Sequence, residues 1–289
     1  MHISSIRPVT TPGNAMNGVV AYDGSTGRNQ VLTPEQVTSS TDATLKDTIA
    51  NAQSVMGFMR EHFGRDGWDA KGATLSVVVH ASEPGMGGAK MNNAYWDTQA
   101  GKMFIGDGDG RMFTPLGLSK DIIAHELGHA ILESEVNMGF EGQQGALHES
   151  FGDVMGSLVD ADDWQIGEDS FTPGKPGDSL RDMSKPAMYQ NMDQVKGRAE
   201  VHDLADIPNL AAVRVAEKIG RQEMGKVWYG AFTEQLKNNA EFADAAAATV
   251  KAAELLYGAG SSQVAAVTDA WTSVGVLKAT TPAPAPKVA

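Results

Sequence analysis

The stretch Asp121–Asp153, DIIAHELGHAILESEVNMGFEGQQGALHESFGD, decides the fold of this chain. Its first part holds the motif HELGH at residues 125–129, and Glu149 follows in its second part. Residues four apart lie on one face of an α-helix, so His125 and His129 can direct their imidazole nitrogens at a single ion. Catalytic zinc sites use three protein ligands and keep a fourth position open for water. The spacing therefore predicts a zinc site on His125, His129 and Glu149.

Two further acidic residues belong to the predicted site. Glu126 projects beside the histidines, where it can hold and deprotonate a water on the metal. Asp153 lies one helical turn after Glu149 on the same face, where a carboxylate can accept the distal N–H of a ligand histidine. The other interpretation is a helix with ordinary surface or core histidines. The flanking positions speak against it because they are apolar, and buried imidazoles need partners that a metal supplies: Ile122, Ile123, Ala124, Leu127, Ala130 and Ile131.

Several segments resemble one known family. HELGH followed by GALHESFGD is similar to the thermolysin-like zinc endopeptidases (gluzincins), whose second motif is a helical Glu-x-x-x-Asp. Four other segments resemble family segments in the same order: NNAYWD at 92–97, GDGDG at 106–110, DWQIGED at 163–169 and GDSLR at 177–181. The resemblance covers roughly residues 70–275. It implies a two-lobed α+β fold with the zinc site in the cleft between the lobes.

Local patterns agree with this fold. Buried or β-prone runs predict strands at 19–22, 75–80 and 102–105, and helical spacing between Ser40–Asp42 and Gly64 predicts a long helix. Residues 164–206 are polar and rich in loops, and helical patterns follow from Ile207 onward, at about 225–237, 242–257 and 262–275. We expect a β-containing N-terminal lobe at 1–136 that includes the HELGH helix, a mainly helical C-terminal lobe at 137–278, and a Pro/Ala-rich tail at 279–289.

Composition narrows the classes of function. With 42% hydrophobic and 20% charged residues, the 289-residue chain has an ordinary globular composition. Its net charge of −13 argues against nucleic-acid partners, which select basic patches, and the absence of cysteine excludes thiol catalysis. No apolar run is long enough to span a bilayer, and MHISSIRPVTTPG lacks the apolar core of a secretory signal. We expect a monomer without membrane partners; the missing signal and pro-segment depart from the family and leave the compartment open.

The resemblance implies further catalytic and substrate-binding residues. Glu126 matches the general base, and His202 matches a histidine that donates a hydrogen bond to the oxyanion, although an ordinary surface histidine is the alternative. Arg181 matches an arginine that grips the substrate carbonyl beside the primed pocket. Asn93 and Ala94 match the segment that pairs with the substrate backbone as an added strand.

Two departures from the family concern the oxyanion. The family's oxyanion tyrosine aligns with Phe140, which has no hydroxyl, and losing one such donor typically costs about 10²–10³ in rate. The acid that orients the family's histidine aligns with Gly197. Three acids could substitute for it: Asp193, Glu200 or Asp203.

The resemblance also implies a hydrophobic primed pocket and a calcium site. The pocket positions, each of which could also be a core residue, are Phe113, Leu116, Ile122 and Leu180. The calcium positions, which could also be a solvated acidic face, are Asp121, Asp160, Asp163 and Glu168. Hard oxygen ligands suit calcium, and Gln165 in place of a family acid favours one ion over a pair.

Together these features predict a zinc-dependent endopeptidase that cleaves proteins or peptides before bulky hydrophobic residues. One alternative is a metal-containing peptide-binding module with weakened catalysis, suggested by Phe140 and Gly197. Another is an effector with one dedicated target. Glu126 favours the enzyme, because a pure binding module gains nothing from a base beside the metal.

Overall fold

A computed structural model describes residues 15–82 and 90–278, so the predicted tail at 279–289 lies outside the described residues. The helices of the described part are α1 (Pro34–Ser39), α2 (Ala43–Phe63), α3 (Lys120–Glu135), α4 (Gly142–Val159), α5 (Val201–Ile219), α6 (Arg221–Gly230), α7 (Phe242–Tyr257) and α8 (Ser262–Ser273). Its strands are β1 (Ala15–Met16), β2 (Val19–Asp23), β3 (Gln30–Val31), β4 (Leu75–Ala81), β5 (Ala94–Asp97), β6 (Lys102–Gly106), β7 (Gln165–Ile166) and β8 (Arg181–Asp182).

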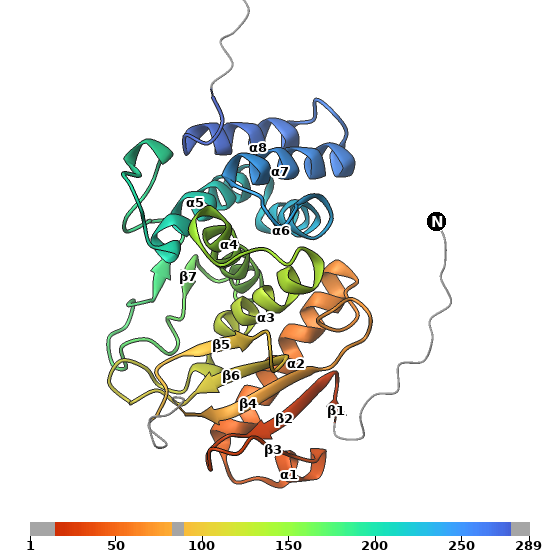
Figure 1. Cartoon of the computed structure of the whole chain (residues 1–289), viewed down its shortest axis with the longest axis vertical. Coiled ribbons are helices and arrows are strands. Elements are labelled where there is room, and N and C mark those ends of the chain that lie inside the picture. Colours follow the sequence, from red (N-terminus) through yellow and green to blue (C-terminus); the bar gives the residue numbers. More distant parts are fainter. Residues whose placement is uncertain (1–14, 83–89, 279–289) are drawn as a thin grey trace, which may run out of the picture.

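The sheet and α2 form one end of the molecule, and α5 to α8 form the other, with α3 and α4 between them (Figure 1). The predicted two-lobed α+β architecture is therefore confirmed.

The N-terminal lobe is built on a mixed sheet with the strand order β1-β2-β4-β6-β5, and β3 pairs with β2. The central strand β4 runs parallel to both β2 and β6, and its apolar residues are buried, as its LSVVVH run predicts. β5 runs antiparallel to β6 with Ala94 opposite Ile105 and Trp96 opposite Met103. Because β5 is the last strand of this order, no other strand among the described residues pairs with its outer edge.

Helix α2 lies against this sheet, and its ends follow the sequence signals. The side chain of Asp42 accepts a hydrogen bond from the Leu45 N–H and caps the first turn. Gly64 ends the helix in a left-handed conformation with φ 65°, which suits glycine because it has no Cβ.

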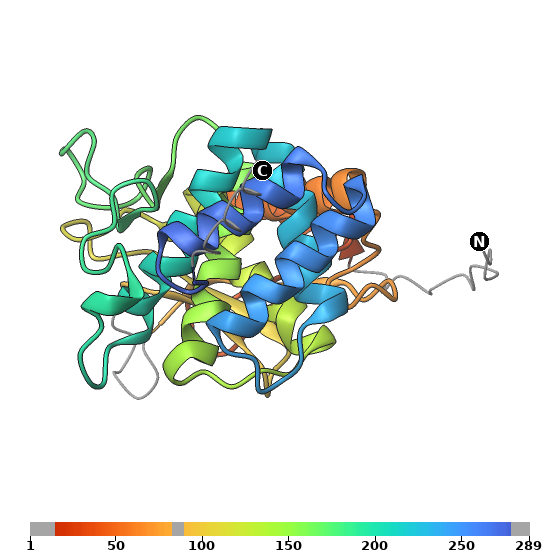
Figure 2. The same cartoon turned by 90° about the horizontal axis from the view of Figure 1, so that it is seen from above.

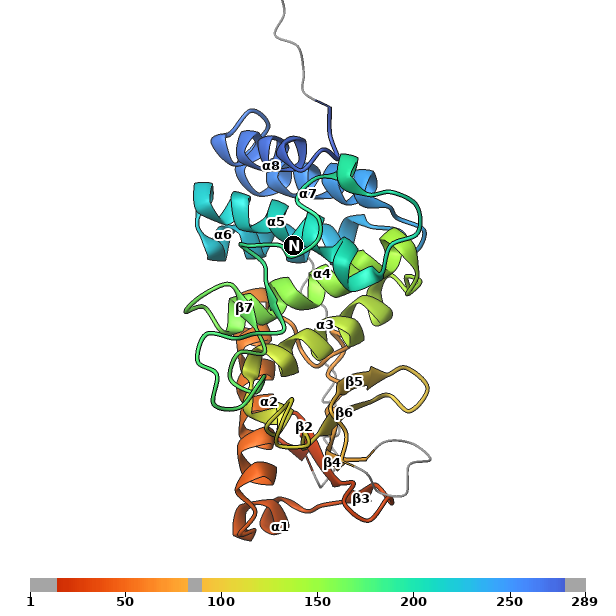
Figure 3. The ribbon, with the colours of Figure 1, turned by 90° about the vertical axis from the view of Figure 1, so that its left-hand side faces the viewer.

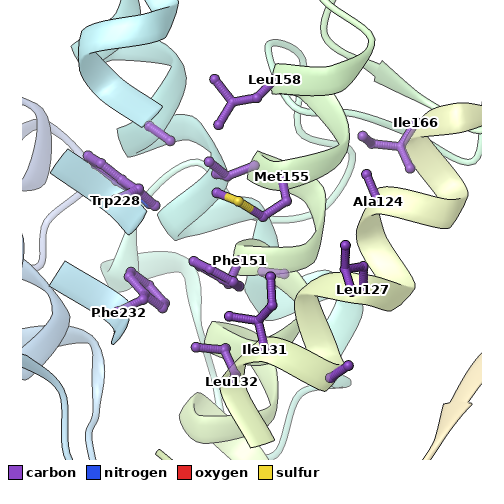
Figure 4. Packing of buried hydrophobic residues seen from close by; sticks show 14 of the residues in the cluster. Ala124, Leu127, Ile131, Leu132, Phe151, Met155, Leu158, Ile166, Trp228 and Phe232 are labelled. Atoms are coloured by element: carbon purple, nitrogen blue, oxygen red, sulfur yellow. The ribbon is translucent and has the colours of Figure 1, made fainter. Parts of the chain in front are cut away.

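Helices α3 and α4 form the core of the molecule. Every residue of α3 from Asp121 to Leu132 is buried, so this helix is surrounded by protein on all sides. Figure 4 shows how side chains of α3 and α4 interdigitate, with Phe151 reaching Phe232 of the C-terminal lobe at a ring distance of 5.2 Å. Polar groups on such helices need partners, and this requirement shapes the functional site.

The C-terminal lobe is helical, and α7 and α8 cover its outer side (Figures 2 and 3). The helix that follows α4, α5, begins at Val201, six residues before the predicted start at Ile207. The sequence prediction missed these six residues because the composition of 164–206 is typical of loops and concealed the helix cap, in which Glu200 accepts from the N–H groups of His202 and Asp203. Among the described residues, no helix combines the length and the apolar character that crossing a membrane requires.

Candidate active site

Two glycines let α3 and α4 approach each other closely. A Cβ on Gly128 would lie 2.9 Å from the Cα of Gly152, and a Cβ on Gly152 would lie 2.6 Å from Nδ1 of His125. Any larger residue at either position would push the helices apart or displace the imidazole. This close contact brings Glu149 of α4 beside the two histidines of α3.

The three predicted zinc ligands converge. The Nε2 atoms of His125 and His129 lie 3.1 Å apart, and the carboxylate of Glu149 lies 3.3 Å from the first and 3.7 Å from the second. All three side chains are buried, and Oε2 of Glu149 has no hydrogen-bond partner among the described residues. Two imidazole nitrogens this close, with an unpaired buried carboxylate oxygen, fit a shared cation. The donor set of two nitrogens and one oxygen is one that catalytic zinc uses.

The charges of the ligands are strongly coupled. Burial opposes the charged form of His125, but Asp153 and Glu149 outweigh it and raise the pKa of His125 to about 10. Burial and the neighbouring His125 lower the pKa of His129 to about 3. Burial would raise the pKa of Glu149, yet the histidines lower it to about 2. A metal binds only deprotonated imidazole, so binding of an ion releases the proton from His125.

Asp153 contacts the nitrogen of His125 that faces away from the other two ligands. Its Oδ1 lies 2.9 Å from Nδ1 of His125 and 2.7 Å from Nη2 of Arg181, while its Oδ2 accepts from Nε of Arg181 and from Nδ2 of Asn209. Burial alone would raise the pKa of Asp153, but Arg181 and His125 keep it well below its usual range. The structure thus places Asp153 where the sequence predicted it. Asn209 of α5 was missed, because no local motif marks a partner 56 residues away.

The second ligand, His129, has a different neighbour that the sequence prediction also missed. Nδ1 of His129 lies 3.3 Å from Nδ1 of His148, the residue before Glu149. Burial lowers the pKa of His148 to about 4. The sequence signal that could have identified His148 is its position next to the predicted ligand Glu149 on the same helix.

Glu126 lies beside the ligands at the edge of the sheet. Its Oε2 accepts a hydrogen bond from the Trp96 N–H at 2.9 Å, which joins α3 to β5. Burial raises the pKa of Glu126 to about 7, despite the nearby charge of His125. A carboxyl group that titrates near neutral pH suits a general base.

His202 reaches the site from the start of α5. Its Nε2 lies 3.3 Å from Oε2 of Glu149, and its Nδ1 lies 2.8 Å from Oε1 of Glu200. Of the three acids considered in place of Gly197, Glu200 is therefore the one that contacts the ring. The side chain of His202 is half exposed, which leaves it accessible from the cleft.

A cleft of about 540 Å³ lies in front of these groups. The predicted substrate-binding residues all line it, including the pocket set: Asn93, Ala94, Phe113, Leu116, Ile122, Leu180 and Arg181. Phe140, which aligns with the family's oxyanion tyrosine, also lines it, together with apolar and aromatic residues that the sequence prediction did not include: Tyr95, Trp96, Met112, Ile166 and Phe171. The sequence prediction missed Phe171 because its side chain is brought to the cleft by an isolated β-bridge with Phe113.

The predicted calcium residues are only partly brought together. Asp160 and Glu168 have carboxylate oxygens close enough to share an ion, together with Asp169, which was not predicted. Asp121 lies next to this group, but its oxygens accept from the N–H groups of Ile122 and Gly167. Asp163 does not belong to the group, and its carboxylate instead binds the backbone and side chain of Gln165.

These acids raise one another's pKa. Burial and the charges of Asp160 and Asp169 raise the pKa of Asp121 to about 6. Burial and Asp121 raise the pKa of Glu168 to about 7, and its Oε2 is buried without a hydrogen-bond partner among the described residues. We refer to Asp121, Asp160, Glu168 and Asp169 as the acidic cluster.

Two histidines and a glutamate on adjacent helices, with a base beside them and a cleft in front, define a metallopeptidase-type zinc site. Comparisons with known proteins agree. The family model for the catalytic domain of thermolysin metallopeptidases matches residues 13–133, and the model for their alpha-helical domain matches residues 136–276. The chain belongs to the thermolysin family of metallopeptidases.

Named relatives and a solved structure support this assignment. The chain is 39% identical to neutral protease B of Bacillus subtilis (strain 168), over 80% of this chain and 45% of the relative, and 37% identical to bacillolysin of Brevibacillus brevis, over 82% and 46%. It therefore spans about half the length of the curated relatives it matches. A structure of the precursor of protealysin, a metalloproteinase from Serratia proteamaculans, matches with a TM-score of 0.81 and 28% identity, covering 93% of this chain and 91% of that one.

Proposed function

We propose that this protein is a zinc-dependent endopeptidase that hydrolyses proteins or peptides. The observation that carries the proposal is the convergence of His125, His129 and Glu149 on one point, with Glu126 beside them at the wall of the cleft. The names of the relatives as neutral protease and bacillolysin support the same class of reaction.

The residues divide the chemistry among them. His125, His129 and Glu149 would hold zinc, which when bound activates a water molecule and polarises a carbonyl group. Oε2 of Glu126 is engaged by the Trp96 N–H, so Oε1 is the oxygen left to take up the proton of the attacking water and pass it to the leaving amine.

The substrate backbone would bind along the outer edge of β5. Backbone groups alternate in direction along a strand, so Ala94 directs its N–H and C=O to the same side as Trp96, whose N–H points away from β6 toward Glu126. Glu126 occupies the Trp96 position, which leaves the backbone of Ala94 for an added strand, whereas the Asn93 carbonyl already accepts from the Gly106 N–H of β6 and only the Asn93 side chain is left for the substrate. Arg181 uses Nε and Nη2 for Asp153, which leaves Nη1 for a substrate carbonyl.

Specificity would come from the apolar pocket beside Arg181. Phe113, Leu116 and Ile122 are buried and form its floor, whereas Leu180 is 37% exposed. We propose cleavage before bulky hydrophobic residues, and a cleavage profile over a peptide library without this preference would contradict it.

We also propose that the acidic cluster binds one calcium ion. Three carboxylates within ligand distance and the unpaired buried oxygen of Glu168 support this, since calcium prefers several oxygen ligands. Asp163 is left out of the ligand set that we propose, because its carboxylate already binds Gln165.

A second candidate function is a metal-containing peptide-binding module with weak catalysis. Phe140 favours it, because this residue is 53% exposed in the cleft and offers no hydroxyl for an oxyanion. His202, held by Glu200, would then be the remaining side-chain donor at this place.

A general-base variant separates the two functions. We expect Glu126→Gln to lower the rate of cleavage of a fluorogenic peptide by about 10²–10⁴ while the zinc content stays unchanged. The matched control is Glu61→Gln, an exposed glutamate of α2, whose substitution should change the rate less than about twofold. Wild-type protein that contains zinc but is no faster than Glu126→Gln would favour the binding module.

A further inference from the structure

His148 lies directly behind the zinc ligand His129. Its side chain is fully buried, with Nδ1 3.3 Å from Nδ1 of His129 and Nε2 3.2 Å from the carbonyl oxygen of Met138. The ring of Phe140 stacks on the imidazole at 4.2 Å with an interplanar angle of 23°. Polar contacts at both nitrogens and an aromatic ring on one face hold His148 in a single orientation.

The carbonyl of Met138 determines which nitrogen of His148 carries the proton. A carbonyl oxygen can only accept, so Nε2 of His148 must be the donor. A ring that donates through Nε2 can accept through Nδ1, and a His129 that binds a metal through Nε2 keeps its proton on Nδ1, so Nδ1 of His148 is the acceptor between the two rings. The atom facing it, Nδ1 of His129, must then be the donor.

This order fixes the proton of the zinc ligand. With its proton on Nδ1, neutral His129 has its lone pair on Nε2, the nitrogen that faces Glu149 and His125. The opposite order would place a lone pair of His148 against the Met138 carbonyl and a proton on the metal-facing nitrogen of His129. Only the first order leaves His129 ready to bind an ion.

We propose that His148 is a positioning residue for the zinc site. Its hydrogen bond to the Met138 carbonyl makes its Nδ1 an acceptor, and this acceptor holds the proton of His129 on Nδ1 and leaves the Nε2 lone pair of His129 facing the metal. This inference rests on the zinc site proposed above but not on peptide hydrolysis. The carboxylate of Asp153 contacts Nδ1 of His125 in the corresponding way, so the two ligand histidines have chemically different partners: a carboxylate for His125 and an imidazole for His129.

The position of the protons can be measured directly in the zinc-loaded wild-type protein. Long-range ¹H–¹⁵N correlation spectra of ¹⁵N-histidine-labelled protein distinguish the two neutral tautomers and the imidazolium. We expect His148 to carry its proton on Nε2 and His129 on Nδ1, with the His148 signals assigned by their loss in a His148→Asn variant. A His148 protonated on Nδ1, or on both nitrogens at neutral pH, would overturn the proposal.

Two substitutions test the effect on metal affinity, measured by competition with a zinc chelator. In His148→Leu no acceptor faces His129, and we expect zinc to bind about 10–100-fold more weakly. In His148→Asn the side-chain oxygen stands where Nδ1 of histidine stands, so we expect an affinity within about threefold of the wild type. The matched control is His62→Leu, an exposed histidine of α2, with unchanged affinity.

The outcomes separate this inference from the proposed function. Wild-type affinity in His148→Leu, or equal losses in the Leu and Asn variants, would contradict the positioning role. If His148→Leu does not fold, the tautomers of the wild-type protein and the affinity of His148→Asn still decide the matter. A protein that binds zinc as expected but cleaves no peptide would remove the proposed function and leave the role of His148 intact.

Discussion

The zinc site lies on α3 and α4, whereas the acidic cluster lies at the start of α3, at the end of α4 and in the loop after β7, and the two regions compensate buried charge in opposite ways. At the zinc site, protein groups of opposite sign already pair with the carboxylates: Asp153 contacts Arg181 and His125, and Glu149 faces both ligand histidines. In the acidic cluster, Asp121 and Glu168 have mainly other carboxylates as charged neighbours, and burial together with these neighbours raises their pKa values.

The two regions therefore differ in how far they depend on a bound ion. The ligands of the zinc site are oriented by the protein before an ion arrives, so binding costs little rearrangement. In the acidic cluster Lys120 is a cationic neighbour of Asp160, so most of the missing positive charge would have to come from a bound cation. We therefore expect perturbations of the zinc site to act through protein partners, and perturbations of the cluster to depend on pH and on calcium.

The largest expected effect comes from breaking the group around Asp153. Asp153→Ala leaves the Arg181 guanidinium and the Asn209 amide without their shared acceptor, and loss of one partner of a buried ion pair typically costs about 3–5 kcal/mol in the free energy of unfolding. We also expect a roughly 10–100-fold loss of zinc affinity, because His125 loses its anchor. Urea unfolding and chelator competition measure the two effects.

The matched comparison is Asp153→Asn, which keeps the size of the side chain and one acceptor oxygen. It should lie between the wild type and Asp153→Ala in both measurements. If Asp153→Ala unfolded at the same urea concentration as the wild type and kept its zinc affinity, the claim that protein groups orient the zinc ligands would be contradicted.

The next effect concerns the acidic cluster and has a defined sign. The pKa values of Asp121 and Glu168 are raised to about 6 and 7, so the folded state binds more protons than the unfolded state between about pH 4 and 7. Stability from these groups is then fully present below pH 4 and is lost as pH rises through about 7. A calcium ion at saturating concentration should restore about 2–3 kcal/mol at pH 7.5, which corresponds to roughly 5 °C or more in melting temperature.

Melting curves from pH 5 to 8 with calcium and with a calcium chelator test this expectation. Asp160→Asn, which removes one proposed ligand, should abolish most of the calcium response. Glu149 provides an internal contrast, because its lowered pKa of about 2 makes its contribution constant over this range. Equal melting temperatures with and without calcium at pH 7.5 would refute the calcium site.

Sequence reasoning worked best where local spacing decides geometry. The helical interval from His125 to His129 places two imidazoles on one face whatever the rest of the chain does. The positions of Glu149 and Asp153 followed from one turn of a second helix. The caps of α2, Asp42 and Gly64, were equally local signals.

The interactions that sequence reasoning missed depend on tertiary contacts. Asn209 of α5 reaches Asp153 of α4 across 56 residues of sequence, and His148 reaches His129 only because α4 packs closely against α3 at Gly128 and Gly152. Asp163 was an acid in the expected segment, yet its side chain turned to Gln165 while Asp169 joined the cluster. Spacing alone does not show which of several neighbouring acids faces a given point. The same holds for Asp193, Glu200 and Asp203, of which only Glu200 reaches the ring of His202.

The smallest expected effect distinguishes Glu200 from Asp203, two acids at the start of α5. Glu200→Gln weakens a half-exposed hydrogen bond to His202 worth about 0.5–1 kcal/mol, so we expect kcat to fall roughly two- to fivefold with little change in KM. Stability should fall by only about 0.5–1 kcal/mol, because Glu200 also caps the helix. Asp203→Asn is the matched control, since Asp203 lies in the same first turn and donates its backbone N–H to Glu200 without touching the ring. Equal rates in the two variants, measured with the fluorogenic peptide, would show that His202 does not depend on Glu200 and that the zinc site is held from α3 and α4 alone.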